Sequence, residues 1–138
     1  MTHAGTFNGN TIATAAVLAS IDELASGEIY EQVGKIGASL MEAIRERAEA
    51  SHLDLHVQGL PMAFHASFAA PGRAVTRFGE LADSDPARYG RLADALIGHG
   101  VWVARRGIWY VSAAHTEADV TESLDRISRA FEASTQET

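Results

Sequence analysis

The sequence of 138 residues contains no cysteine, and Lys35 is its single lysine. Without cysteine, disulfide bridges and thiolate metal sites are excluded, and a reducing compartment is the expected location. Basic residues are also few, because eleven stand against eighteen acidic ones and the net charge is -7. A nucleic-acid-binding domain usually has a basic face, so we expect no nucleic-acid partner.

Long apolar runs are missing as well. No window holds eighteen uninterrupted apolar residues, and the N-terminus shows no basic stretch followed by an apolar one. These absences argue against a transmembrane helix and a secretion signal, so we expect a cytoplasmic protein with no membrane partner. An apolar content of 46% is ordinary for a globular protein, and the length fits one domain with a real core.

Glycine and asparagine are concentrated in a short loop before an alanine-rich stretch. The run is His3-Ala4-Gly5-Thr6-Phe7-Asn8-Gly9-Asn10. These residue types favour left-handed turns and helix N-caps, which leave backbone N–H groups pointing outward at a positive helix end. That arrangement suits a phosphate or carboxylate. On spacing alone, the same pattern also fits a helix start that is merely well capped.

Two helices are predicted in the first third of the chain. Residues 11–25 form the first, capped by Asn8 or Asn10, and its apolar side chains surround almost the whole helix. Such a helix is expected to be buried on every side, against a further domain or a second subunit. Residues 28–50 form the second helix, because apolar residues recur on one face at Ile29, Val33, Ile36, Leu40 and Ile44.

Glycines weaken the second helix at two positions, Gly34 and Gly37. Each costs about 1 kcal/mol relative to alanine in a helix interior. We therefore expect close packing against a neighbouring element at both positions.

Alternation of apolar and polar residues begins after Ser51. It predicts strands around residues 53–57 and 62–68, joined through Gly59-Leu60-Pro61. Residues 69–84 are expected to be a long connection.

Three more elements are predicted in the last part of the chain. Asp85 followed by proline marks a helix start. Residues 101–104 and 108–112 are expected to form a hairpin that turns at Arg105-Arg106-Gly107. Thr116 with Asp119 three residues later begins the last helix.

The order helix, helix, strand, strand, helix, strand, strand, helix predicts an α+β fold, a small antiparallel sheet covered by helices. We divide the chain into a loop and buried linking helix at residues 1–27, an α+β domain at 28–134, and a frayed tail at 135–138.

The run at residues 3–10 resembles the start of the C-terminal part of class III pyridoxal-phosphate aminotransferases, and within them the glutamate-1-semialdehyde aminomutase branch. Three further matches follow in the family's order, and the four cover nearly the whole chain. They are Gly59-Leu60-Pro61-Met62-Ala63-Phe64, Gly100-Val101-Trp102-Val103-Ala104 and Val111-Ser112-Ala113-Ala114-His115-Thr116. One departure is Thr11, where the family usually has proline.

The resemblance implies the architecture of the C-terminal domain of fold type I pyridoxal-phosphate enzymes. It also implies that the Thr6 hydroxyl and Gly5 contact the cofactor phosphate in the neighbouring subunit's active site, while Asn8 shapes the loop. The expected cofactor is therefore pyridoxal phosphate, bound in trans. The expected partner is a second copy of the chain or a missing large domain. The alternative is that Thr6 only caps a turn.

The family's Schiff-base lysine lies upstream of the glycine-threonine motif, in a large domain. Lys35 falls in the middle of an amphipathic helix, where a solvated side chain is the simpler account. We assign no catalytic residue, and the chain alone is expected to be inactive. The leading interpretation is the C-terminal domain of an aminotransferase or aminomutase. The alternatives are a non-catalytic small-molecule-binding or interaction module, and one half of a split enzyme.

Other polar residues give weaker signals. Arg105 and Arg106 are candidates for binding a substrate carboxylate through a guanidinium group. His52, Asp54 and His56 would share one face of a strand, as zinc ligands do. The wet face of a half-exposed strand explains them better, so no metal site is expected. His115 is expected to be a hydrogen-bonding structural residue rather than a general base.

Overall fold

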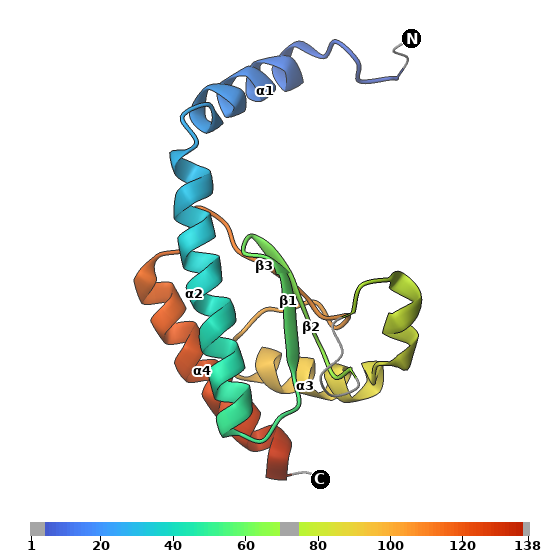
Figure 1. Cartoon of the computed structure of the whole chain (residues 1–138). Coiled ribbons are helices and arrows are strands. Elements are labelled where there is room, and N and C mark those ends of the chain that lie inside the picture. The colour runs from blue at the N-terminus through green and yellow to red at the C-terminus, as the bar shows by residue number, and fades with distance from the viewer. Residues whose placement is uncertain (1–4, 70–74, 137–138) are drawn as a thin grey trace. The chain divides into compact units, whose positions relative to one another are not determined.

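The computed structural model describes residues 5–69 and 75–136 and is shown in Figure 1. The chain falls into two compact units, the first ending at Gln32 and the second beginning at Val33. His3 and Ala4 of the N-terminal motif lie outside the described residues. The division of the chain into domains stays a prediction.

The first unit contains α1, Thr11–Leu24. Asn10 is its N-cap, because the Asn10 side chain accepts a hydrogen bond from the Ala13 N–H at 3.0 Å. No residue of α1 is buried by the described part of the chain. Its large apolar side chains are exposed by 56 to 82%, and they are Ile12, Val17, Leu18 and Ile21.

Helix α2, Glu28–Ala50, has the predicted bounds and runs into the second unit. Of its two interior glycines, only Gly37 packs closely. A Cβ at Gly37 would lie 2.1 Å from the Pro61 carbonyl oxygen, whereas one at Gly34 would meet no described atom within 4 Å. The packing prediction is therefore confirmed for Gly37 and wrong for Gly34.

Helix α2 is followed by a left-handed residue, His52, whose φ is 54°. The His52 N–H donates to the Glu49 carbonyl at 3.0 Å, and the Leu53 N–H donates to the Ala48 carbonyl at 2.8 Å. This pair of bonds is the Schellman arrangement. The prediction that His52 shares a strand face with His56 is therefore wrong, because His52 belongs to the helix end.

The sheet has three antiparallel strands in the order β1-β2-β3. They are β1, His56–Leu60; β2, Ala63–Ser67; and β3, Ile108–Tyr110. The expected strand at residues 101–104 is wrong, because these residues are irregular. Both edges of β2 are already occupied by β1 and β3, so this segment finds no ladder on the central strand.

The remaining helices are η1, a 3-10 helix at Phe78–Asp83, α3, Pro86–Gly98, and α4, Glu117–Gln136. The start of α3 is confirmed, because the Asp85 side chain accepts from the Arg88 N–H at 2.8 Å. Helix η1 occupies part of the expected connection. Helix α4 continues past residue 134, where the tail was expected to fray.

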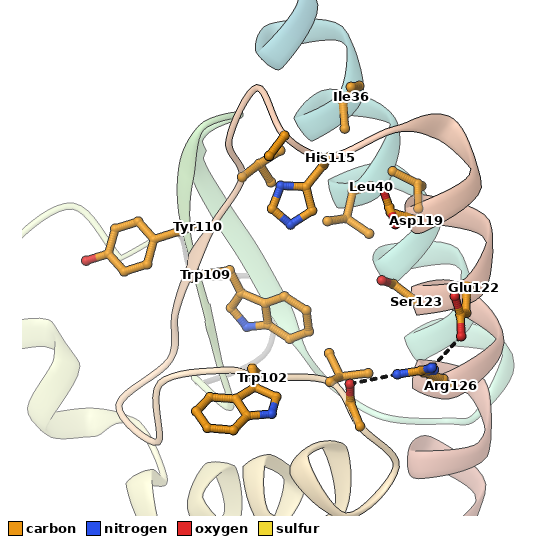
Figure 2. Close-up of a pocket in the computed structure, with 15 residues that line it drawn as sticks. Ile36, Leu40, Trp102, Trp109, Tyr110, His115, Asp119, Glu122, Ser123 and Arg126 are labelled. Atoms are coloured by element: carbon orange, nitrogen blue, oxygen red, sulfur yellow. Dashed lines mark hydrogen bonds and ion pairs between the residues drawn. The ribbon is translucent and has the colours of Figure 1, made fainter.

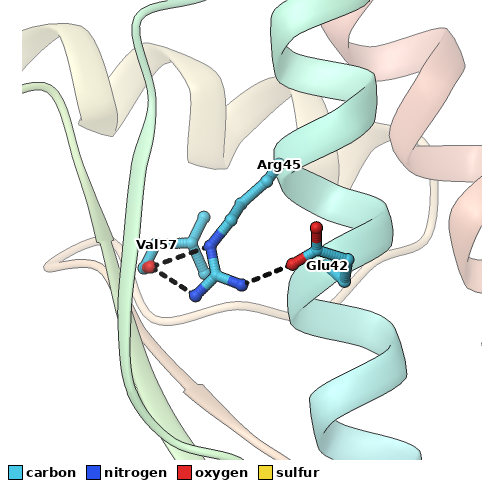
Figure 3. A network of polar contacts seen from close by, with 3 residues as sticks. All are labelled: Glu42, Arg45 and Val57. Carbon is cyan, nitrogen blue, oxygen red and sulfur yellow. Dashed lines mark hydrogen bonds and ion pairs between the residues drawn. The ribbon is translucent and has the colours of Figure 1, made fainter.

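The second unit is held together by a core of Ile44, Phe64, Leu92, Ile127 and Phe131, each at most 2% exposed. Polar contacts fix its layers as well. The Arg45 guanidinium donates twice to the Val57 carbonyl, at 3.2 and 2.8 Å, and so joins α2 to β1 (Figure 3). The prediction of an α+β fold with helices covering a small antiparallel sheet is confirmed.

Candidate functional site

The loop at residues 5–10 is exposed along its whole length. Two turns shape it, since the Asn8 N–H donates to the Gly5 carbonyl at 3.0 Å and the Asn10 N–H donates to the Phe7 carbonyl at 3.1 Å. Gly9 adopts a left-handed φ of 77°, which glycine reaches without strain. The loop therefore has a defined backbone conformation up to the start of α1.

Within this loop, Asn8 and Asn10 have different tasks. Asn10 caps α1, whereas the Asn8 side chain lies over Gly5, where an added Cβ would be 2.9 Å from its Oδ1. The described residues offer no hydrogen-bond partner to the Thr6 hydroxyl. Asn10 rather than Thr6 is therefore the helix cap, and Thr6 is exposed in the loop that leads into the positive end of α1. A phosphate group fits this set of donors.

Arg105 and Arg106 lie in the tight turn before β3, as expected. The Arg105 guanidinium pairs with the Asp94 carboxylate at 2.8 Å. The Arg106 carbonyl lies 3.1 Å from Nε2 of His65 on β2. Within the described residues the Arg106 side chain has no ion-pair partner, so Arg106 is the freer of the two guanidinium groups.

A small cavity of about 150 Å³ adjoins this turn, and its lining includes His65, Tyr89, Arg105 and Arg106. Tyr89 is 3% exposed and accepts a hydrogen bond from Nε1 of Trp109 at 2.9 Å. Burial raises the pKa of Tyr89 to about 12, against the smaller lowering effect of the Trp109 bond. The phenol therefore stays neutral at any physiological pH.

Sequence reasoning misses His65 and Tyr89 as contributors to the site. The helical spacing places Tyr89 only in an apolar stripe, and its bond partner lies twenty residues away in sequence. His65 contacts a carbonyl forty-one residues away. No local pattern predicts such pairs. The sequence signal nearest to them is the presence of Trp102 and Trp109 on either side of the arginine turn.

His115 lines a larger cavity of about 420 Å³, together with Ile36, Leu40, Trp102 and Trp109 (Figure 2). Nδ1 of His115 accepts a hydrogen bond from the Ser112 N–H at 3.1 Å. Asp119 beside it accepts from the Thr116 N–H and hydroxyl, each at 2.7 Å. His115 and Asp119 thus secure the entry into α4, in keeping with the structural role expected for His115.

Two further observations concern metal sites and membrane-spanning helices. Within residues 5–69 and 75–136, no group of three or more histidine and carboxylate side chains is arranged to hold a metal ion. In the same part of the chain, no helix is both long and apolar enough to cross a membrane.

The chain was compared with protein-family models, known sequences and solved structures. No protein-family model matches the chain. The chain is 30% identical over 131 residues to a glutamate-1-semialdehyde 2,1-aminomutase of Pyrobaculum calidifontis, covering 94% of the chain and 29% of that enzyme. The chain therefore spans less than a third of the length of this relative.

Solved structures also match the chain over about 30% of their own length. A transaminase with pyridoxal phosphate bound superposes with a TM-score of 0.81 at 22% identity, covering 99% of this chain and 30% of its own. The FumI protein of Sphingopyxis, solved with pyridoxal phosphate in its internal aldimine form, gives 0.81 at 25% identity with the same coverage. The resemblance is confirmed: the chain is similar to about 30% of the length of pyridoxal-phosphate transaminases and of a glutamate-1-semialdehyde 2,1-aminomutase.

Proposed function

We propose that this chain is the C-terminal part of a pyridoxal-phosphate-dependent aminotransferase or aminomutase that moves an amino group on a glutamate-1-semialdehyde-like substrate. The carrying observation is the 30% identity to the Pyrobaculum aminomutase along nearly the whole chain. The lysine that anchors the cofactor would lie in the part of the enzyme to which the remaining length of the relative corresponds. The assembled enzyme is proposed to be a cytoplasmic homodimer.

In this proposal the loop at residues 5–10 holds the cofactor phosphate in the active site of the neighbouring subunit. The Thr6 hydroxyl donates to a phosphate oxygen, and Gly5 lets the backbone approach closely. Asn8 keeps the turn in shape through the hydrogen bond between its N–H and the Gly5 carbonyl. The positive end of α1 adds electrostatic attraction for a dianion. Bound pyridoxal phosphate supplies the electron sink for amino-group transfer.

The arginine turn supplies a candidate for substrate recognition. The Arg106 guanidinium is proposed to bind the substrate carboxylate, because its five donors match a carboxylate in a bidentate pair. Arg105 would support it from its ion pair with Asp94. The bond between His65 and the Arg106 carbonyl would hold the turn in place on β2.

The proposal is tested by reconstitution. Residues 5–136 replace the matching segment of the Pyrobaculum aminomutase, and the hybrid is purified without added cofactor. We expect the hybrid to retain pyridoxal phosphate, seen by its visible absorbance, and to transfer amino groups. A hybrid that folds and dimerises but binds no cofactor would contradict the proposal.

A split enzyme makes a different prediction in the same system. In that case the lysine-bearing portion, produced as a separate chain, recovers cofactor binding when this chain is mixed with it. The covalent hybrid and the mixture then behave alike. If only the covalent hybrid binds the cofactor, the split-enzyme alternative is excluded.

A further inference from the structure

A third cavity, of about 930 Å³, lies where the end of α2, the first turns of α3 and the end of α4 meet. None of the residues assigned to the cofactor loop or to the arginine turn lines it. Its lining includes three arginines, Arg47 from the end of α2 and Arg88 and Arg91 from α3, against one carboxylate, Glu132. An excess of positive charge in one cavity is unexpected in a chain whose net charge is -7.

The arginines of this cavity lack the ion pairs that three other arginines of the chain form. Arg45, Arg105 and Arg126 each form an ion pair with a carboxylate. In contrast, the described residues give Arg47 only neutral acceptors, the Ser128 hydroxyl at 3.1 Å and the Ala43 carbonyl at 3.3 Å.

The two arginines of α3 are equally without a carboxylate partner in the described part of the chain. The Arg88 guanidinium lies over the Phe68 ring, 4.1 Å from its centre, and Arg91 makes no polar contact there. Stacking on a ring orients a guanidinium and leaves its N–H edge free. Three arginines of one cavity therefore keep donors available for an external anion.

The rest of the cavity narrows the class of anion. The hydroxyls of Ser128, Ser134 and Thr135 already donate to carbonyls of α4, so donors for a ligand come mainly from the guanidinium groups. Leu53, Phe68 and Leu92 form a buried apolar floor. Near such a floor charges attract more strongly than in bulk water.

We propose that this cavity binds a small organic phosphate that carries at least two negative charges, with Arg88 and Arg91 as its main contacts and Arg47 as a third. Guanidinium groups match phosphate oxygens in bidentate pairs. Binding would connect α2, α3 and α4, because the three arginines come from α2 and α3 and the cavity wall from α4. This inference is independent of the proposed cofactor loop.

The test uses the whole chain and inorganic pyrophosphate as the probe, titrated by calorimetry at about 150 mM salt, where exposed charges are largely screened. We expect saturable binding with one site per chain. Arg91→Ala and Arg88→Ala should each raise the dissociation constant at least about tenfold, the size expected for one charged hydrogen bond. Arg129→Ala removes the same charge from an exposed position outside the cavity and should change it less than about twofold.

Amide chemical shifts test where the probe binds, and a comparison with malonate tests which class of anion the cavity prefers. Pyrophosphate should shift the amide resonances of residues 51–53 and 134–135 and leave those of residues 5–10 unchanged, and Thr6→Ala should not weaken it. Malonate has two acceptor oxygens on each charged group where a phosphate group has three, so it should bind at least about tenfold more weakly. The proposal is overturned if wild type shows no saturable binding, if Arg129→Ala weakens binding as much as Arg91→Ala, or if malonate binds equally well.

Discussion

At the scale of single residues, two glycines of one helix allow the packing account to be tested with matched substitutions. Gly37→Ala would place a Cβ 2.1 Å from the Pro61 carbonyl oxygen, a backbone atom that cannot rotate away. We expect the variant to lose about 1–3 kcal/mol of unfolding free energy, the usual cost of overpacking. Urea titration followed by circular dichroism measures it.

Gly34→Ala is the control for that experiment. No described atom lies within 4 Å of the position that the added methyl group would take, so only the helix propensity changes. We expect a gain of about 0.5–1 kcal/mol. Equal effects of the two substitutions would contradict the contact between α2 and the turn after β1.

The outcome at these glycines shows what sequence reasoning resolves at the residue scale. The bounds of the helix that contains Gly34 and Gly37 can be predicted, because apolar spacing is a local signal. Which glycine meets a neighbour depends on a turn more than twenty residues away, which spacing does not reveal. Arg45 illustrates the same limit: its place on the polar side of the helix predicts a solvated side chain, and 41% of that side chain is exposed. The spacing does not reveal that its guanidinium also donates to the Val57 carbonyl.

At the scale of elements, capping signals are the most reliable. The starts of α3 and α4 carry Asp85 and the Thr116–Asp119 pair, and both act as caps in the structure. Strand predictions are weaker, because a strand exists only where a partner edge is free. Residues 101–104 have strand-like composition, but β1 and β3 already occupy both edges of β2. His52 likewise belongs to the end of α2 and not to β1.

The α4 cap makes stability depend on pH. Hydrogen bonds from the Thr116 hydroxyl and N–H, with a smaller effect of His115, lower the pKa of Asp119. A carboxyl whose folded pKa is depressed stabilises the fold above its unfolded pKa, about 4, and this contribution is lost as pH falls further. Asp119→Asn should therefore lower the melting temperature at about pH 6, and the difference from wild type should shrink below about pH 4.

Asp125→Asn is the control, because Asp125 is exposed on the same helix. It should leave the melting temperature nearly unchanged over the same range. A difference between Asp119→Asn and wild type that stays constant as pH falls below about 4 would show that the carboxylate charge does not act through the cap.

At the scale of the whole molecule, α1 is the feature that the described chain does not explain by itself. Its large apolar side chains are more than half exposed. An apolar surface of this kind is normally covered by another protein surface. We expect the isolated chain to self-associate, and light scattering over a dilution series should show oligomers that dissociate on dilution.

Substitution within α1 links the association to that helix. Leu18→Gln together with Ile21→Gln should shift the equilibrium toward monomer and leave the core of the second unit intact, since neither side chain is buried. A chain that stays monomeric at high concentration and binds no dye for exposed apolar surface would refute this expectation.

The central claim is that Thr6 holds a cofactor phosphate rather than capping a helix, and one substitution in the reconstituted hybrid tests it most directly. Asn10 already caps α1, so Thr6→Ala should leave the unfolding midpoint of the chain unchanged. The dissociation constant for pyridoxal phosphate should rise about ten- to hundredfold, as expected for a lost hydrogen bond to a charged group of about 1.5–3 kcal/mol, and Thr6→Ser should restore it. A large drop in the unfolding midpoint with an unchanged dissociation constant would contradict the account.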